Sequence, residues 1–411
     1  MKDVFELNTQ TQKKFICNRE TGRWVLANQL DSEILEKISV SIDKGPFTDT
    51  SLIVLNIGRQ CNFDCAYCYL GNLKREGKQM PIEIGRKIID QVSELKQDKK
   101  QVVFHGSEPL LNFSLIKDLV DYSKKNYQNI NFCLQTNGSL LDEEKLEFLS
   151  QEGITAGISL DGLKLHQDQN RPYIGGISSY SDVSTNLSQL KQYQKGVSII
   201  TVITRENVGD LEKIVADFKE KGIDSVLFSL VGSKDKSVYP DLEMLSKKMK
   251  LVLDNYIDSV YIGRPTIKIR NLRDMLRTFL KNRTTTNCVQ CGGTQSHPLM
   301  AVDIDGSIYP CDFFCGIEEY KIGNIFSDSL EESFNSKKNF RVYRNIETIE
   351  ECSECDWKRF CGGGCAGISV LEGRGITSKS YYCDYFKKIF SYVAGIIPVL
   401  HEKRLIKTIL S

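Results

Sequence analysis

The chain has 411 residues, which is long enough to bury full hydrophobic cores and to form two or three domains. Hydrophobic residues make up 41% of it and charged residues 26%, the proportions of an ordinary water-soluble protein. The formal net charge of +1 gives no electrostatic reason to expect binding to nucleic acid or to an anionic membrane. No stretch approaches the roughly 20 apolar residues of a membrane span, so a membrane protein is not expected.

The chain contains fourteen cysteines, and its N-terminus lacks the basic and then apolar layout of a signal peptide. The cytoplasm keeps thiols reduced, so this number of cysteines without a secretion signal favours metal binding over disulfides. We therefore expect a cytoplasmic metalloprotein.

Residues 1–50 predict a small N-terminal extension. Short apolar runs at 5–7, 14–16 and 23–27 indicate strands, and Ser32 is in position to cap a short helix that ends near Ile38. We expect a hairpin and helix that pack on the main domain; the alternative is a docking element for a peptide or another partner.

Residues 51–280 alternate between strand-like runs and amphipathic helical stretches. The predicted strands cover 52–57, 102–105, 130–136, 154–160, 197–203 and 225–230. The predicted helices cover 84–95, 114–124, 142–149, 183–193, 208–221 and, as one helical region, 246–280. Six β/α units in series predict an α/β fold with a parallel sheet, which is typical of a partial (β/α)6 barrel with its working residues at the carboxyl ends of the strands.

Residues 281–390 differ in composition from the preceding segment: they are rich in Cys and Gly, and their pattern predicts short strands and turns. Apolar periodicity resumes near Tyr385, and we expect residues 391–411 to form a C-terminal helix. The predicted domains are therefore 1–50, 51–280, 281–390 and 391–411.

The first cysteine cluster follows the first predicted barrel strand and consists of Cys61, Cys65 and Cys68. Three thiolates can bind three irons of a four-iron cluster and leave the fourth iron open to a small molecule. The CxxxCxxC spacing, with aromatic Tyr67 before the third Cys, resembles the signature of radical S-adenosylmethionine (SAM) enzymes. The competing interpretation is a structural zinc site, which would need a fourth ligand that is not nearby.

The same resemblance implies which residues hold SAM. The second strand ends in Gly106-Ser107-Glu108-Pro109, where the family has GGEP, and Ser107 replaces the second Gly. The backbone and Glu of this motif bind the amino group of SAM in the family. Ser159 and Asp161 are the candidates for the ribose, and Arg171 is the candidate partner of the SAM carboxylate. A loop cap or a surface ion pair is the alternative role for each of the last three.

A second set of cysteines begins with Cys291 and Cys311, which flank Gly306, and continues as Cys352-x2-Cys355-x5-Cys361-x3-Cys365 and then Cys383. This spacing resembles the SPASM domain that follows the barrel in radical SAM enzymes that modify peptides and proteins. Together with the barrel motifs, this resemblance spans residues 51–385. It implies two auxiliary four-iron clusters, which makes three [4Fe-4S] clusters in all. The inner cysteines would be Cys291, Cys311 and Cys365, and the outer cysteines Cys352, Cys355, Cys361 and Cys383.

The fourth ligand of the inner cluster is left open by the sequence. Cys288 is the first candidate, Cys315 is the second, and an open iron that binds a substrate thiolate is the third interpretation. A pair of zinc sites is also compatible with cysteine-only spacing. Asp312, next to Cys311, resembles the carboxylate of anaerobic sulfatase-maturing enzymes that is the proposed base toward the substrate.

The resemblance implies a radical SAM oxidoreductase whose SAM-derived radical takes a hydrogen from its substrate. The predicted substrate is a ribosomally made precursor peptide, in which the enzyme installs an intramolecular thioether or carbon–carbon cross-link. The alternative is an anaerobic sulfatase-maturing enzyme that oxidises Cys or Ser to formylglycine, and a third hypothesis is a non-catalytic metal scaffold. An external one-electron reductant, flavodoxin or ferredoxin, is the other expected partner, with no nucleic acid and no membrane.

Overall fold

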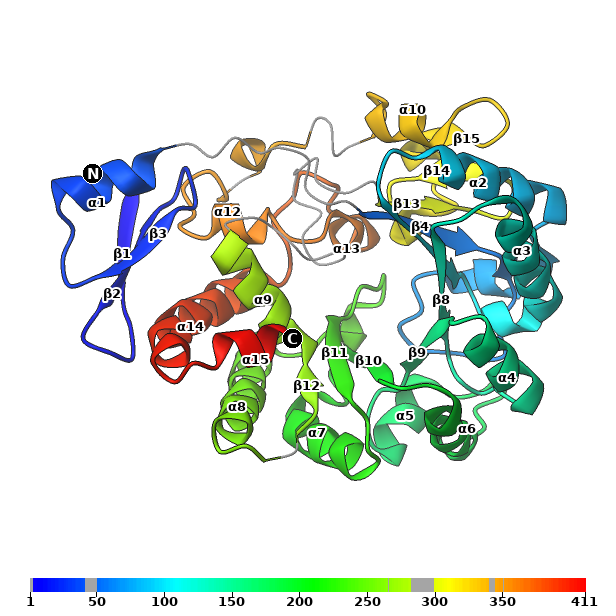
Figure 1. Ribbon diagram of the computed structural model, residues 1–411, viewed down its shortest axis with the longest axis horizontal. Coiled ribbons are helices and arrows are strands. Elements are labelled where there is room, and N and C mark those ends of the chain that lie inside the picture. Colours follow the sequence, from blue (N-terminus) through cyan, green and yellow to red (C-terminus); the bar gives the residue numbers. More distant parts are fainter. Residues whose placement is uncertain (1–2, 41–49, 265, 282–298, 340–343, 350) are drawn as a thin grey trace.

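The computed structural model describes residues 3–40, 50–264, 266–281, 299–339, 344–349 and 351–411 (Figure 1). Its centre is a curved sheet that contains the predicted barrel strands. These are β4 (Thr50–Asn56), β7 (Lys99–His105), β8 (Ile130–Thr136), β9 (Thr155–Ser159), β10 (Ser198–Ile203) and β11 (Ser225–Leu230). They lie side by side in chain order and all pair in parallel. The α/β partial barrel predicted from the sequence is confirmed.

Amphipathic helices connect these strands and cover the outer face of the sheet (Figure 1). They are α2 (Ile82–Glu94), α3 (Phe113–Asn126), α4 (Glu143–Gln151), α5 (Lys164–Asn170), α6 (Tyr180–Tyr193) and α7 (Leu211–Glu220). In α2 the buried residues include Ile84, Ile88 and Val92, four residues apart, so one stripe of the helix faces the sheet.

The helical region predicted over 246–280 contains two helices with a short strand between them. The chain forms α8 (Leu242–Tyr261), turns at Gly263 with φ +68°, adds the short strand β12 (Lys268–Ile269) to the sheet, and continues as α9 (Arg270–Lys281). Glycine reaches this positive φ without the steric penalty that a Cβ would impose, which explains the break.

The cysteine-rich segment continues the barrel sheet through main-chain hydrogen bonds. Strand β13 (Leu299–Val302) pairs in parallel with β4, and β14 (Ser307–Tyr309) and β15 (Gly323–Asn324) follow as antiparallel neighbours. The remaining elements are short: η5 (Asp312–Phe314), η6 (Glu318–Tyr320), α10 (Leu330–Asn335), η7 (Ile346–Thr348), α12 (Lys358–Cys361) and α13 (Ala366–Leu371). This arrangement brings the turn after Cys311 against the first barrel strand.

The C-terminal helix begins earlier than predicted. It runs as α14 (Cys383–Glu402) and is followed by α15 (Ile406–Leu410), so the last cysteine forms the first turn of the helix. Its buried face packs against α8 and α9. None of the helices in the described part of the chain is long and apolar enough to cross a membrane.

The N-terminal module, residues 3–40, is a three-stranded antiparallel sheet with one helix. It comprises β1 (Val4–Asn8), β2 (Lys14–Asn18), β3 (Trp24–Ala27) and α1 (Ser32–Ser39). The predicted cap is wrong by one residue, because Asp31 accepts the hydrogen bond from the Ile34 amide at 2.8 Å. The module packs on the auxiliary segment, with the Phe5 and Trp357 rings 5.1 Å apart, and also on α9 and α14 (Figure 1). The Trp24 indole donates to the Phe279 carbonyl of α9 at 2.9 Å.

Candidate active site

The first cysteine cluster lies in the loop that follows β4. The short strands β5 (Gly58–Arg59) and β6 (Lys78–Gln79) pair across the base of this loop, and the Cys61 amide donates to the Lys74 carbonyl at 3.1 Å. Burial raises the thiol pKa of Cys61 to about 11 and that of Cys65 to about 12, and the charge of Cys68 adds to both increases. Three neighbouring thiols in one loop suit an iron–sulfur cluster, whose irons would stabilise their thiolates.

The end of β7 carries the candidate SAM motif. Gly106 has φ +111°, and a Cβ there would lie 3.0 Å from the Gly58 carbonyl oxygen, so the loop requires glycine. Glu108 is 2% exposed, and its carboxylate accepts from the Thr136 hydroxyl at 2.7 Å and the Asn137 amide at 2.8 Å. Burial nevertheless raises its pKa to about 7. An ammonium group beside it would restore the charged form, as the predicted contact with SAM requires.

Three of the other predicted SAM residues form a buried triad. The Tyr67 hydroxyl donates to Asp161 at 2.5 Å, and the Arg171 Nε pairs with the same carboxylate oxygen at 3.1 Å. The Arg171 guanidinium also lies over the Tyr67 ring, 5.3 Å from its centroid. Asp161 thus orients Tyr67 and Arg171, and the predicted contacts of Asp161 with the ribose and of Arg171 with the carboxylate stay predictions. Ser159 is separate from this triad and accepts from the Gln135 amide at 3.1 Å.

Asp312 lies next to the first cysteine cluster although more than 240 residues separate them in the sequence. The Tyr69 hydroxyl donates to the Asp312 carboxylate at 2.8 Å, and the Tyr69 ring lies 4.7 Å from that of Phe313. Burial, and then the Asp312 charge, raise the pKa of Tyr69 well above its ordinary value, so this hydroxyl keeps its proton and remains a donor. Sequence reasoning missed Tyr69, which directly follows Cys68.

Two of the inner cysteines come together where η5 meets α13. Cys311 and Cys365 are buried and directly precede these two elements, which pack against each other. Cys288 and Cys291 lie outside the described residues. Cys315 is buried at the other end of η5, and it lines a small pocket together with Asn56 at the end of β4. The fourth ligand of this site therefore stays a prediction.

The outer cysteines lie around one small pocket. All four line it, with Trp357 and three lysines: Lys358, Lys379 and Lys387. Burial and then the charges of the three other thiols raise the pKa of Cys361 to about 12. In the described part of the chain no three His, Cys, Asp or Glu side chains gather closely enough for one metal ion. The ring of thiols around a cavity, with positive charge at its rim, fits an anionic four-iron cluster.

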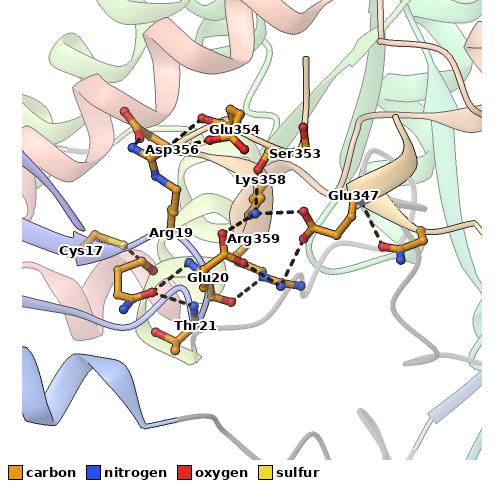
Figure 2. A network of polar contacts seen from close by, with 12 residues as sticks. Cys17, Arg19, Glu20, Thr21, Glu347, Ser353, Glu354, Asp356, Lys358 and Arg359 are labelled. Atoms are coloured by element: carbon orange, nitrogen blue, oxygen red, sulfur yellow. Dashed lines mark hydrogen bonds and ion pairs between the residues drawn. The ribbon is translucent and has the colours of Figure 1, made fainter. Parts of the chain in front are cut away.

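A network of buried charge joins this ring to the N-terminal module (Figure 2). Lys358, whose side chain is 1% exposed, donates to Glu20 at 2.6 Å, to Glu347 at 3.0 Å and to the Ser353 carbonyl at 2.7 Å. Arg359 donates to the Glu20 carbonyl at 2.7 Å. Every proton of the Lys358 ammonium thus has an acceptor, and the turn before β3 is fixed against the segment that carries Cys355 and Cys361.

Comparison with known families identifies the class of protein to which this chain belongs. The family model of the Radical SAM superfamily matches residues 55–218. The chain belongs to this superfamily. A second model, SPASM, described as an iron-sulfur cluster-binding domain, matches residues 288–356. The protein is a radical SAM oxidoreductase with a SPASM domain, and its cofactors are SAM and iron–sulfur clusters, as predicted.

Individual relatives indicate which kind of radical SAM enzyme the chain is most similar to. The cysteine-type anaerobic sulfatase-maturating enzyme of Clostridium perfringens is 28% identical over 362 residues, which cover 83% of this chain and 95% of the relative. A structure of anSMEcpe with bound AdoMet and Kp18Cys peptide has a TM-score of 0.75 at 27% identity, covering 86% of this chain and 98% of that one. SuiB of Streptococcus suis, bound to precursor peptide SuiA, has a TM-score of 0.59 at 15% identity, covers 93% of this chain and 99% of that one, and shows a likeness of fold alone. Of the two predicted enzyme functions, these findings favour the sulfatase-maturing alternative over the cross-linking one.

Proposed function

We propose that this radical SAM enzyme oxidises a Cys or Ser residue of a polypeptide to formylglycine, as anaerobic sulfatase-maturing enzymes do. The observation that carries the proposal is the buried Tyr69–Asp312 hydrogen bond between the first cysteine cluster and Cys311. The similarity to the cysteine-type anaerobic sulfatase-maturating enzyme of Clostridium perfringens, which covers 95% of that relative, also supports this function.

The chemistry removes one hydrogen atom from Cβ of the target, one proton from its thiol or hydroxyl, and one electron, which gives the aldehyde directly from Ser and a thioaldehyde from Cys. Water would then hydrolyse the thioaldehyde, supplying the aldehyde oxygen and releasing hydrogen sulfide. When bound, SAM and the cluster at the first cysteine cluster would supply the radical that takes the hydrogen atom. Asp312 is our candidate acceptor of the proton. Tyr69 would hold that carboxylate in place through its single donated hydrogen bond, and the adjacent Cys311 would hold the group that accepts the electron.

Residues 1–50 give a reason to keep the cross-linking function as a second candidate. The N-terminal module is a folded unit beside the auxiliary segment, of the kind that would bind part of a longer precursor peptide. In that case the same two-electron oxidation would join the target carbon to another group of the peptide.

Mass spectrometry separates the two functions. A Cys-containing peptide such as Kp18Cys, incubated with reconstituted enzyme, SAM and reductant, should become about 18 Da lighter and react with a hydrazine reagent as an aldehyde. A cross-linked peptide would be about 2 Da lighter, would not react, and would fragment poorly between the joined residues. Loss of about 2 Da without an aldehyde from a Cys peptide would replace the first function by the second.

The proposal also includes a cytoplasmic location, where thiols stay reduced, and an external one-electron donor, flavodoxin or ferredoxin. The predicted domains 51–280 and 281–390 would divide the work: the barrel would hold SAM and the target, and the SPASM domain the auxiliary clusters.

A further inference from the structure

The loop that carries the first cysteine cluster is paired with the segment that follows α5. Residues 62–66 of the loop run antiparallel to residues 170–174, and main-chain hydrogen bonds of 2.7–3.1 Å join the two segments. This register places Cys65 opposite Arg171, the predicted partner of the SAM carboxylate. The position of Arg171 and the position of the cysteine loop are therefore coupled through the backbone.

Gln167, on α5 four residues before Arg171, is fully buried and bridges two parts of the candidate SAM site. Its side-chain oxygen accepts from the Asp161 amide at 3.0 Å. Its side-chain nitrogen donates to the buried Ser179 hydroxyl at 3.1 Å, and that hydroxyl donates to the Arg171 carbonyl at 2.7 Å. A continuous chain of hydrogen bonds thus runs from Asp161 to Arg171, separate from the direct ion pair between their side chains.

The two ends of this chain fix the direction of every bond in it. The Asp161 amide can only donate and the Arg171 carbonyl can only accept, so the side chain at position 167 has to accept at one atom and donate at another. The amide of glutamine does both, whereas a carboxylate only accepts. A buried chain of this kind is stable only when every member is paired, so it favours one placement of Asp161 relative to Arg171.

We propose that Gln167 is a positioning residue of the SAM site. It fixes Asp161, the predicted ribose contact, and Arg171, the predicted carboxylate contact, at the spacing that SAM requires, and through Arg171 it holds the cysteine loop. Gln167 acts through these two residues, and it raises the affinity for SAM because groups that are already in place lose less freedom when the ligand binds.

The test measures the Kd of SAM by equilibrium dialysis at pH 6 and pH 8 in the reconstituted holoenzyme without peptide, so it does not depend on the proposed substrate. The variants are Gln167→Glu and Ser179→Ala, and the matched control is Gln169→Glu, the same change at an exposed glutamine of the same helix. Each Kd is divided by the wild-type Kd at the same pH, since Glu108 has a pKa of about 7. The iron content and the Tm of each variant are measured alongside.

The Gln167→Glu variant should bind SAM in a pH-dependent way. Burial and the nearby carboxylates of Asp161 and Asp168 would raise the pKa of the new carboxyl, and the charge of Arg171 would lower it. At pH 6 the protonated acid can donate as the amide does, so the Kd ratio should stay within about threefold of one. At pH 8 the carboxylate cannot donate, so the Arg171 carbonyl loses its partner and the Kd ratio should rise to about ten.

The other two variants separate this chain of bonds from a general effect of charge on α5. Ser179→Ala removes the last donor and should raise the Kd about tenfold at both pH values, whereas Gln169→Glu should match the wild type. A Kd ratio for Gln167→Glu that is equal at both pH values, or a rise at pH 8 in Gln169→Glu as well, would overturn the proposal. A wild-type Kd in Ser179→Ala would also overturn it, and this variant decides alone if Gln167→Glu fails to retain iron.

Discussion

The buried ammonium of Lys358 is the feature whose removal has the most predictable energetic result. Its two carboxylate partners come from different parts of the chain, Glu20 from the N-terminal module and Glu347 from the segment before the outer cysteines. Replacing both by alanine would leave a buried cation with only the Ser353 carbonyl as acceptor. The docking of the N-terminal module should weaken, because its Glu20 supplies half of the compensating charge.

The magnitude follows from the burial of the three groups. Removing the partners of a buried charge costs about 3–5 kcal/mol. Glu20 and Glu347 are 44% and 37% exposed, so water can reach the ammonium once they are gone, and the lower end, about 3 kcal/mol, applies here. At about 1.4 kcal/mol per tenfold, the N-terminal module should open about 10²-fold more often.

Native-state hydrogen exchange of the amides in β2, followed in the holoenzyme, measures that opening. The Glu20→Ala/Glu347→Ala variant should exchange about 10²-fold faster in β2. Adding Lys358→Met should restore most of the protection, since the apolar stem remains and no unpaired charge is left. If the triple variant exchanges as fast as the double variant, the buried charge is not what holds the module, and the reasoning is refuted.

Three further predictions concern the cofactors and the chemistry. Anaerobically reconstituted protein should hold about twelve irons in three four-iron clusters, and finding zinc, or only about four irons, would contradict this. The variant with Cys61, Cys65 and Cys68 replaced by alanine should keep about eight irons and form no 5′-deoxyadenosine. Because the raised pKa of Glu108, about 7, keeps it partly protonated, the affinity for SAM should increase up to about tenfold as pH rises from about 6 to 8, and Glu108→Gln should abolish that dependence in equilibrium dialysis. Asp312→Asn should still cleave SAM but yield little oxidised peptide, and Tyr69→Phe should show a milder loss, about tenfold; full product from Asp312→Asn would exclude it as the proton acceptor.

The barrel could be predicted closely because its strands are short apolar runs bounded by turns and followed by amphipathic helices. Strands β8 and β11 begin and end at the predicted residues, and β9 is shorter than predicted by one residue at each end. Where a glycine interrupts a helical region, as at Gly263, the periodicity did not place the break between α8 and α9. The local sequence pattern thus predicted which helices and strands are present better than it predicted where each one is interrupted.

The site was predictable only where function imposes a spacing. The cysteines can be recognised from their spacing in the sequence. The partner of Asp312, in contrast, is a tyrosine that no local pattern distinguishes, since the contact spans 243 residues. Lys358 was missed for a different reason: lysine is ordinarily exposed, and only the converging carboxylates of Glu20 and Glu347 make its burial tolerable. Both are consequences of tertiary packing.

The pairing of β13 with β4 has a consequence for anyone who would separate or exchange the two halves of this enzyme. Without β13, the first barrel strand would become the bare edge of a sheet, with a row of unpaired amides and carbonyls ready to recruit another chain. In the intact protein the described sheet instead ends on that side at β15, a strand of only two residues. A chimera carrying a foreign SPASM domain must therefore bring a strand that matches the register from Leu52 with Leu299 to Leu55 with Val302, or it will expose the edge of its own catalytic barrel.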